Sequence, residues 1–414
     1  MSNERYARLA EYIEKQQDEV IHLMKHLIPF RSLGPLNGGE GESKEAEWIM
    51  NYLRELGIGD VRNYPAPDHT VPSGERPNVV ATIPGKNKTK NIWIMSHIDV
   101  VPEGDMNKWK TPPYEAVVRD GRIYGRGTED NHQGLVSSLI VAGAFARLNI
   151  QPEHTLKLVF VSDEETNSIY GLEYLMKHHK DMFGRDDLYI VPDAGEPDGS
   201  MIEVAEKSIL WLKFTTRGKQ VHASTPERGV NAFKAAAHFI VELNTLYDIF
   251  DRKDEVFDPP ISTFEPTRRE ANVPNVNTIP GDDVFYLDCR ILPSYSIDEV
   301  EEAIRTMMRR IEEKFGVTIT MEENQREDAA PATAPDAPVV KALQRALRET
   351  RHIEGQPVGI GGGTVAAVFR RAGLSTAVWS TLDDMAHQPN EYCRIDNLLK
   401  DALVFAHVTT QSLD

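Results

Sequence analysis

Residues 91–99 read Asn-Ile-Trp-Ile-Met-Ser-His-Ile-Asp, a short apolar run followed at once by a histidine and an aspartate. Further apolar runs lie at 156–161, 188–191 and 376–379, and stretches with helical character, such as 135–148, separate the runs. Apolar strands that alternate with helices are typical of a mostly parallel sheet covered by helices. The sequence therefore predicts an α/β fold.

The middle of the chain predicts a second architecture. Strands are expected at 209–216 and 284–292, helices at 232–246 and 297–315, and a further strand at 317–321. This order of strands and helices indicates a compact, ferredoxin-like α+β unit inserted into the larger domain.

The expected domain boundaries follow from these elements. Residues 1–208 and 326–414 should form the larger domain, and residues 209–325 the insert. Residues 249–274 are rich in Pro, Asp and Arg, so we expect a long loop there. At the N-terminus, apolar residues between 9 and 27 recur with the spacing of an amphipathic helix.

Composition excludes several classes of protein. The 414 residues include 46 basic and 64 acidic side chains, a net charge of −18, which disfavours binding to nucleic acid and to anionic membranes. The two cysteines, Cys289 and Cys393, form neither a CxxC motif nor a disulfide framework. No apolar run approaches the ~18 residues of a membrane span, and the N-terminus lacks the apolar core of a signal peptide. We expect a cytoplasmic protein.

Acidic residues and histidines follow the predicted strands. In an open parallel sheet, ligands bind at the carboxyl ends of the strands. A lone carboxylate there is most often a helix cap or a solvated loop residue, but capping does not also select histidines. Imidazole and carboxylate together suit zinc, or cobalt and manganese in its place. The residues concerned are His97, Asp99, Asp130, Glu164, Glu165, Asp193 and His387.

Two local spacings refine this expectation. His97 and Asp99 lie two residues apart in an extended segment, so the Asp99 carboxylate can accept the free N–H of the His97 ring and orient it. Glu164 and Glu165 are adjacent and point apart, so one can bind metal while the other handles protons.

Several ordered motifs resemble a known family, the two-zinc amidohydrolases and exopeptidases. Its members include glutamate carboxypeptidase, acetylornithine deacetylase, aminoacylase and succinyl-diaminopimelate desuccinylase, and the last of these is the nearest resemblance. The resemblance covers about residues 10–410. It is carried by Ser96-His-Ile-Asp-Val-Val-Pro102, Tyr124-Gly-Arg-Gly-Thr-Glu-Asp130, Asp163-Glu-Glu-Thr166, Pro192-Asp-Ala194, Gly218-Lys-Gln-Val-His-Ala-Ser-Thr-Pro226 and His387-Gln-Pro-Asn-Glu391.

The resemblance implies a role for each of these residues. Asp130 would bridge two divalent metal ions, with His97 and Asp193 completing one site. Glu165 and His387 would complete the other. Glu164 would be the general base of amide hydrolysis, and Asp99 would orient His97.

The resemblance also implies that the insert is a lid through which the chain forms a homodimer. His222 would reach into the neighbouring subunit's site and stabilise an oxyanion, although a structural histidine in a turn is the alternative. The remaining expected substrate-binding residues are Asn277, Arg290, Gly362, Gly363 and Thr364.

Two departures leave the substrate open. Val365-Ala-Ala follows Thr364 where many relatives soon carry Asp, and Ser208 replaces a glycine often found at the entry to the lid. We expect a deacylase acting on an N-acyl amino acid. The alternatives are a dipeptidase or carboxypeptidase with the same site, and a catalytically silent metal-binding scaffold.

Overall fold

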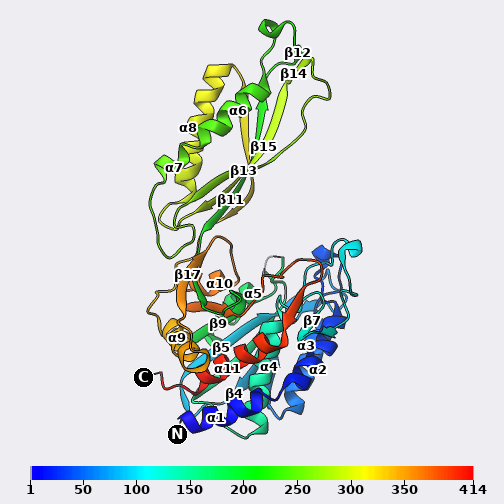
Figure 1. Ribbon diagram of the computed structural model, residues 1–414, viewed down its shortest axis with the longest axis vertical. Coiled ribbons are helices and arrows are strands. Elements are labelled where there is room, and N and C mark those ends of the chain that lie inside the picture. The colour runs from blue at the N-terminus through cyan, green and yellow to red at the C-terminus, as the bar shows by residue number, and fades with distance from the viewer. Residues whose placement is uncertain (1, 167, 414) are drawn as a thin grey trace. The chain divides into compact units, whose positions relative to one another are not determined.

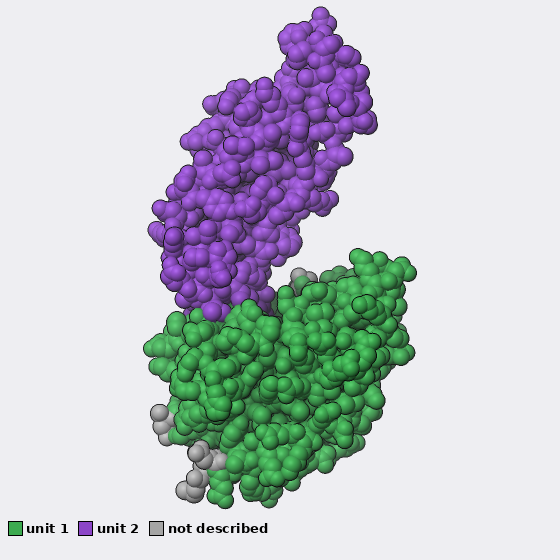
Figure 2. Space-filling view, viewed as in Figure 1, with its two compact units in different colours: residues 1–204, 333–357, 368–414 green, residues 205–332, 358–367 purple. Residues whose placement is uncertain are grey.

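The computed structural model describes residues 2–166 and 168–413, and it divides into two compact units (Figure 2). Unit 1 comprises 1–204, 333–357 and 368–414, and unit 2 comprises 205–332 and 358–367. The predicted insert falls within unit 2. The short segment 358–367, which we expected in the larger domain, packs with unit 2.

Unit 1 is built on an eight-stranded sheet in the order β1-β4-β8-β5-β9-β18-β10-β17, although the last residues of β10 and β17 fall within the residue ranges of unit 2. Figure 1 labels β4, β5, β9 and β17 of this sheet. The centre of the sheet, β8-β5-β9-β18, is parallel, whereas β4 is antiparallel to β1 and β8, and β10 is antiparallel to β18. The predicted mostly parallel sheet is therefore confirmed. The strands are β1 Asp60–Asn63, β4 Val79–Ile83, β5 Asn87–His97, β8 His154–Val161, β9 Leu188–Gly195, β10 Met201–Glu206, β17 Gln356–Ile360 and β18 Thr376–Ser380.

Helices pack around this sheet. α4 is buried at every position from His132 to Phe145, because it packs against β5 and β9 and also against α1, α2 and α11. This explains why its sequence is mostly apolar and lacks a charged face, with its few buried polar side chains hydrogen-bonded, such as Gln133 and Ser137. The helices are α1 Ser2–Ile13, α2 Gln17–Leu27, α3 Ser43–Glu55, α4 His132–Arg147, α5 Leu172–His178, α9 Pro338–Arg351, α10 Ala366–Arg371 and α11 Ile395–Thr410. The single helix expected between residues 9 and 27 is thus two helices.

Small sheets complete unit 1. β7 (Arg122–Tyr124) pairs with β6 (Val117–Arg119) on one side and with β19 (Tyr392–Arg394) on the other. β2 (Ala66–Pro67) pairs with β3 (Glu75–Arg76). The β7–β19 pair joins segments that are far apart in the sequence.

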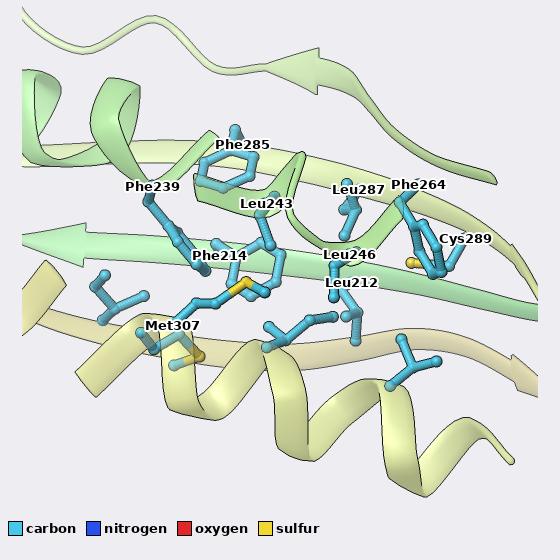
Figure 3. Close-up of a cluster of buried hydrophobic side chains, with 14 of the residues drawn as sticks. Leu212, Phe214, Phe239, Leu243, Leu246, Phe264, Phe285, Leu287, Cys289 and Met307 are labelled. Atoms are coloured by element: carbon cyan, nitrogen blue, oxygen red, sulfur yellow. The ribbon is translucent and has the colours of Figure 1, made fainter. Parts of the chain in front are cut away.

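Unit 2 is built on an antiparallel sheet in the order β13-β15-β11-β16. Its strands are β11 Ser208–Arg217, β13 Thr263–Arg269, β15 Asp282–Ile291 and β16 Thr318–Glu327, with α6 Ala232–Leu243, α7 Leu246–Ile249 and α8 Ile297–Phe315. A separate pair joins β12 (Val221–His222) to β14 (Thr278–Ile279). Aromatic and aliphatic side chains fill the core between sheet and helices, among them Phe214, Phe239, Phe285 and Met307 (Figure 3).

The expectation of a continuous loop over 249–274 is wrong, because β13 lies inside it. β13 is an edge strand in which Phe264 is buried and the five residues from Glu265 to Arg269 are exposed. An edge strand tolerates Pro266 and charged side chains, since one of its sides has no pairing partner to satisfy. Its composition therefore resembles that of a loop.

Helix α8 has the bounds expected from the sequence. The Ser296 side chain accepts a hydrogen bond from the Glu299 N–H, and the Glu299 carboxylate accepts one from the Ser296 N–H, which fixes the first turn. Gly316 ends the helix in the left-handed region, with φ of 66°. In the described part of the chain, no helix is both long enough and apolar enough to cross a bilayer.

Candidate metal centre

The predicted ligands lie at the carboxyl ends of the central strands of unit 1. His97 is the last residue of β5, Glu164 and Glu165 follow β8, and Asp193 lies near the end of β9. Asp130 lies two residues before the start of α4, and Asn131 is the residue between them. The parallel arrangement brings these ends to one edge of the sheet.

Asp130 contacts two histidines from different segments. Its Oδ1 atom lies 2.8 Å from His97 Nε2, and its Oδ2 atom lies 3.1 Å from His387 Nε2. His387 Nε2 is also 3.0 Å from Glu165 Oε2, and His97 Nε2 is 3.4 Å from Asp193 Oδ1. The structure thus brings all five predicted ligands together around the Asp130 carboxylate.

Two overlapping groups of side chains have the compactness that a metal ion requires. One group is His97, Asp130 and Glu165, and the other is His97, Glu164 and Asp193; within each group the possible ligand atoms all lie within 4.8 Å of one another. Glu164 Oε2 is 4.0 Å from His97 Nε2. The predicted base therefore lies among the predicted ligands.

The donor set fits divalent cations. His97 Nδ1 is 2.9 Å from the main-chain oxygen of Asp99 and donates to it, and His97 Nε2 faces the Asp130 carboxylate at 2.8 Å. Glu165 Oε1 is buried and has no hydrogen-bond partner among the described residues. Nitrogen and oxygen donors of this kind suit zinc, cobalt and manganese.

The electrostatics of the site also fit cations. Burial raises the pKa of Glu164 well above its ordinary value, and the nearby Asp193 raises it further. Burial and Asp130 likewise raise the pKa of Glu165. Hydrogen bonds to Asp130 and Glu165 raise the pKa of His387 to about 10. Four carboxylates crowded around two imidazoles add to the effect of burial, and a bound cation would offset this excess of negative charge.

Asp99 contacts different groups from those expected. Its Oδ1 atom is 3.6 Å from His97 Nδ1, longer than a hydrogen bond, and the His97 ring donates instead to the Asp99 main chain. The Asp99 carboxylate accepts the N–H groups of Glu164 and Glu165, each at 3.0 Å. The carboxylate therefore fixes the backbone that carries the predicted base and one predicted ligand.

Asn131 is a site residue that sequence reasoning missed. Its side-chain amide donates to the Asp193 carboxylate and to the Pro192 main-chain oxygen, at 2.8 Å for the latter. Its place directly after Asp130 was a signal that could have drawn attention to it.

His222 and the predicted substrate-binding residues all lie in unit 2, in two places, although the glycine loop was expected in the larger domain. His222 pairs with Thr278 across the β12–β14 ladder, and the N–H of Ala223 donates to the Asn277 main-chain oxygen at 2.8 Å. The ladder thus brings exposed His222 beside Asn277. The His222 ring contacts the Ser224 hydroxyl at 2.7 Å.

Arg290 and the glycine loop form the second place. Arg290 makes two hydrogen bonds to the Asp288 carboxylate, at 2.7 and 3.0 Å, and a third to the main-chain oxygen of Gly361 at 2.8 Å. Thr364 donates its N–H and hydroxyl to Glu206, at 2.8 and 2.5 Å. Arg290 therefore already binds a carboxylate within its own unit, and it anchors the loop that begins at Gly361.

Comparison with known proteins decides the family. Residues 93–411 match the sequence profile of peptidase family M20/M25/M40. The chain belongs to this family. It is 43% identical over 406 residues to an uncharacterized metallohydrolase of Methanocaldococcus jannaschii, and the match covers 94% of this chain and 98% of that protein.

More distant relatives carry more specific names. A succinyl-diaminopimelate desuccinylase of Roseobacter denitrificans is 27% identical over 336 residues, covering 80% of this chain and 86% of that protein. This likeness is weaker than the one to the Methanocaldococcus jannaschii protein. The motifs had suggested that the desuccinylases are the nearest group, and these identities do not support that expectation. The crystal structure of human carnosine dipeptidase 1 has the same fold, with a TM-score of 0.71, 18% identity and 98% of each chain covered.

Proposed function

We propose that this member of the M20/M25/M40 family is a metal-dependent amidohydrolase that removes the acyl group from an N-acyl amino acid. The observation that supports it best is the Asp130 carboxylate, which presents one oxygen toward His97 and the other toward His387. Two dications held close together would need an anion between them, and the Asp130 carboxylate would provide it.

Asp130 and the four predicted ligands around it would hold two ions, most suitably zinc. His97 and Asp193 would complete one site, and Glu165 and His387 the other, with Asp130 shared. When bound, the ions supply Lewis acidity that lowers the pKa of a water molecule and polarises the scissile carbonyl.

Glu164 would move the proton. Its carboxylate lies 4.0 Å from His97 Nε2 and is largely buried, and burial raises its pKa. A base with a raised pKa can accept a proton from the attacking water and return it to the leaving amine. Asp99 would hold Glu164 in position, because the Asp99 carboxylate accepts a hydrogen bond from the main-chain N–H of Glu164.

Unit 2 would supply substrate contacts. In this proposal the chain forms a homodimer through unit 2, and His222 stabilises the oxyanion in the partner's site. Asn277, Arg290, Gly362, Gly363 and Thr364 would contact the substrate. Because Arg290 is bound to Asp288, a substrate carboxylate would have to share or displace that contact.

The deciding experiment is amide hydrolysis by zinc-reconstituted protein, with a chelator-treated sample as control. The substrates are N-succinyl-diaminopimelate, N-acetylornithine, other N-acyl amino acids and simple dipeptides. We expect metal-dependent turnover of one class of N-acyl amino acid. Turnover of dipeptides alone would replace the deacylase by a peptidase with the same site. Two bound ions without turnover of any substrate would contradict the proposal and favour a silent scaffold.

A further inference from the structure

Two loops each carry one of the proposed ligands, Asp130 and His387, and the structure holds these loops side by side. The first, 125–130, directly follows β7 and ends at Asp130. The second, 381–391, contains His387 and directly precedes β19. Because β7 pairs with β19, and because the Gly125 N–H donates to the Glu391 main-chain oxygen at 3.0 Å, the loops leave the same ladder together. The contacts that fix the loops there bear on metal binding, and their role rests on the proposed function.

Glu391 belongs to the second loop, but its carboxylate binds the first. Its Oε1 atom accepts the N–H groups of Glu129 and Asp130 at 2.9 and 3.2 Å. Its Oε2 atom accepts the N–H of Gly127 at 3.0 Å and the Arg126 guanidinium at 2.6 Å. The Glu391 side chain is completely buried. Four donors from one loop thus converge on a carboxylate that the other loop provides.

Glu129 makes the reverse connection. It belongs to the first loop, and its carboxylate accepts the N–H groups of Asp383 and Met385 in the second, the former at 2.6 Å. The residue is 2% exposed. Arg126 adds a third link, a hydrogen bond of 3.4 Å to the His387 main-chain oxygen. Each loop therefore binds the backbone of the other through a buried glutamate.

The second loop needs such support because of its conformation. Asp384, His387 and Asn390 have φ values of 62°, 63° and 65°, in the left-handed region that non-glycine residues seldom adopt. The surrounding structure must hold these residues in place. Asn390 is bound to the main chain of Lys108 and Lys110, and Glu129 anchors the other end of the loop. The His387 side chain itself is 56% exposed, so packing alone does not fix it.

We propose that Glu129 and Glu391 are positioning residues that hold His387 and Asp130 in place for metal binding, each acting on the loop opposite its own. Neither carboxylate is proposed to touch a metal ion or the substrate. Each carboxylate accepts hydrogen bonds from main-chain N–H groups of the opposite loop, and these bonds fix the backbone positions from which the ligand side chains extend. Groups that orient metal ligands typically change metal affinity 10- to 100-fold.

The geometry predicts an asymmetry between the two glutamates. Glu129 anchors only the loop of His387, so its loss should weaken chiefly the ion held by Glu165 and His387. Glu391 fixes the main chain at Asp130, which is shared by both sites, so its loss should weaken both ions. A general loss of stability produces no such difference.

The test compares E129Q and E391Q with E203Q, a matched control. Glu203 is also a completely buried glutamate of unit 1, bound by the Arg370 guanidinium at 2.8 and 2.9 Å in a contact that involves none of the proposed ligands. Zinc stoichiometry and the two dissociation constants are measured by competition with a chromophoric chelator, and the unfolding temperature of each metal-free protein is recorded separately. E129D, which keeps the charge but withdraws the carboxylate by one methylene, is the second variant if E129Q does not fold.

We expect E129Q to bind one zinc ion with the wild-type affinity and the other about 10- to 100-fold more weakly. E391Q should weaken both ions, E129D should lie between E129Q and the wild type, and E203Q should lower only the unfolding temperature. The inference is wrong if E129Q and E391Q bind two ions as tightly as E203Q does, whatever their stability. A wild-type protein that binds no zinc would instead remove the proposed function, and this inference with it.

Discussion

At the scale of single residues, Asp130 and its neighbours show how charge is distributed in the candidate centre. Burial opposes ionisation of Asp130, but hydrogen bonds from His387 and His97 lower its pKa below the ordinary value. The same burial raises the pKa of Glu164. Two carboxylates in one cluster are thus driven in opposite directions, as expected when one is a permanent anion and the other exchanges protons.

Glu164→Gln tests the proton-transfer role. Glutamine keeps the size of the side chain but cannot accept the proton of an attacking water. We expect kcat to fall by about 10²- to 10⁴-fold while both zinc ions stay bound. Steady-state kinetics and metal analysis of the same preparation check this. Full amide hydrolysis by a metal-loaded Glu164→Gln protein would exclude Glu164 as the base.

His222→Ala tests the proposed oxyanion role. Removing a donor to the oxyanion should lower kcat by about 10²- to 10³-fold with little change in zinc content. His238→Ala is the control, because His238 is also exposed in unit 2 and its ring packs only on Phe315 among the aromatic contacts described. Equal rates for wild type, His222→Ala and His238→Ala would remove His222 from the chemistry.

Sequence reasoning found these residues unequally. The proposed ligands could be found from the sequence because His97, Glu165 and Asp193 come at or soon after the end of an apolar run. The contacts of Glu129 could not be found from the sequence. Its carboxylate accepts a hydrogen bond from a main-chain N–H 254 residues away, and a main-chain N–H leaves no mark in the residue type. The Arg290–Asp288 pair was accessible in principle, since residues i and i+2 of a strand share a face.

At the scale of secondary-structure elements, helices α9 and α11 meet through a buried histidine. His407 of α11 contacts the Glu349 carboxylate of α9 at 2.9 Å, and its ring lies edge-on to Tyr6 of α1, with centroids 4.8 Å apart. Burial lowers the pKa of His407, although Glu349 opposes the shift. The three helices therefore pack best around a neutral imidazole.

This gives a pH dependence of stability. Below the unfolded-state pKa of about 6.5, the unfolded chain binds a proton at His407 more readily than the folded chain does. The contribution of His407 is therefore fully present above pH 6.5, and it decreases as pH falls toward the lower folded-state pKa. Denaturant unfolding of chelator-treated protein at pH 7.5 and 5.5 should show a smaller loss in His407→Gln than in wild type. An equal loss in both proteins would contradict this assignment.

Elements with strong end signals were predictable, and elements without them were not. Ser296, Glu299 and Gly316 define α8 within the sequence itself. β13 was not predicted because its composition resembles that of a loop. It forms a strand because it pairs with β15. The division of the N-terminal segment into α1 and α2 was also not predicted, because the apolar residues keep their helical spacing across the break between them.

At the scale of the whole molecule, each unit has its own hydrophobic core. The core of unit 2 lies between the antiparallel sheet and helices α6 and α8, and that of unit 1 surrounds the eight-stranded sheet. Two cores can unfold separately. The candidate metal centre belongs to unit 1 alone.

Calorimetry should therefore show two unfolding transitions, only one of which responds to zinc. Ligand binding at 1,000 times Kd stabilises the folded state by about 4 kcal/mol. We expect zinc to raise the transition of unit 1 by several degrees and to leave that of unit 2 in place. EDTA should reverse the shift. A single transition, or two that move together, would show that the units unfold as one.

The assignment of residues 358–367 to unit 2 has a consequence for anyone who wishes to express that unit alone. The chain passes between the units four times, so any continuous segment that contains all of unit 2 also contains residues 333–357 of unit 1. A gene fragment covering 205–332 would lack Gly361 and Thr364, and with them the hydrogen bonds to Arg290 and Glu206. A gene that joins the codons for 358–367 through a linker to one end of the 205–332 fragment would restore both contacts.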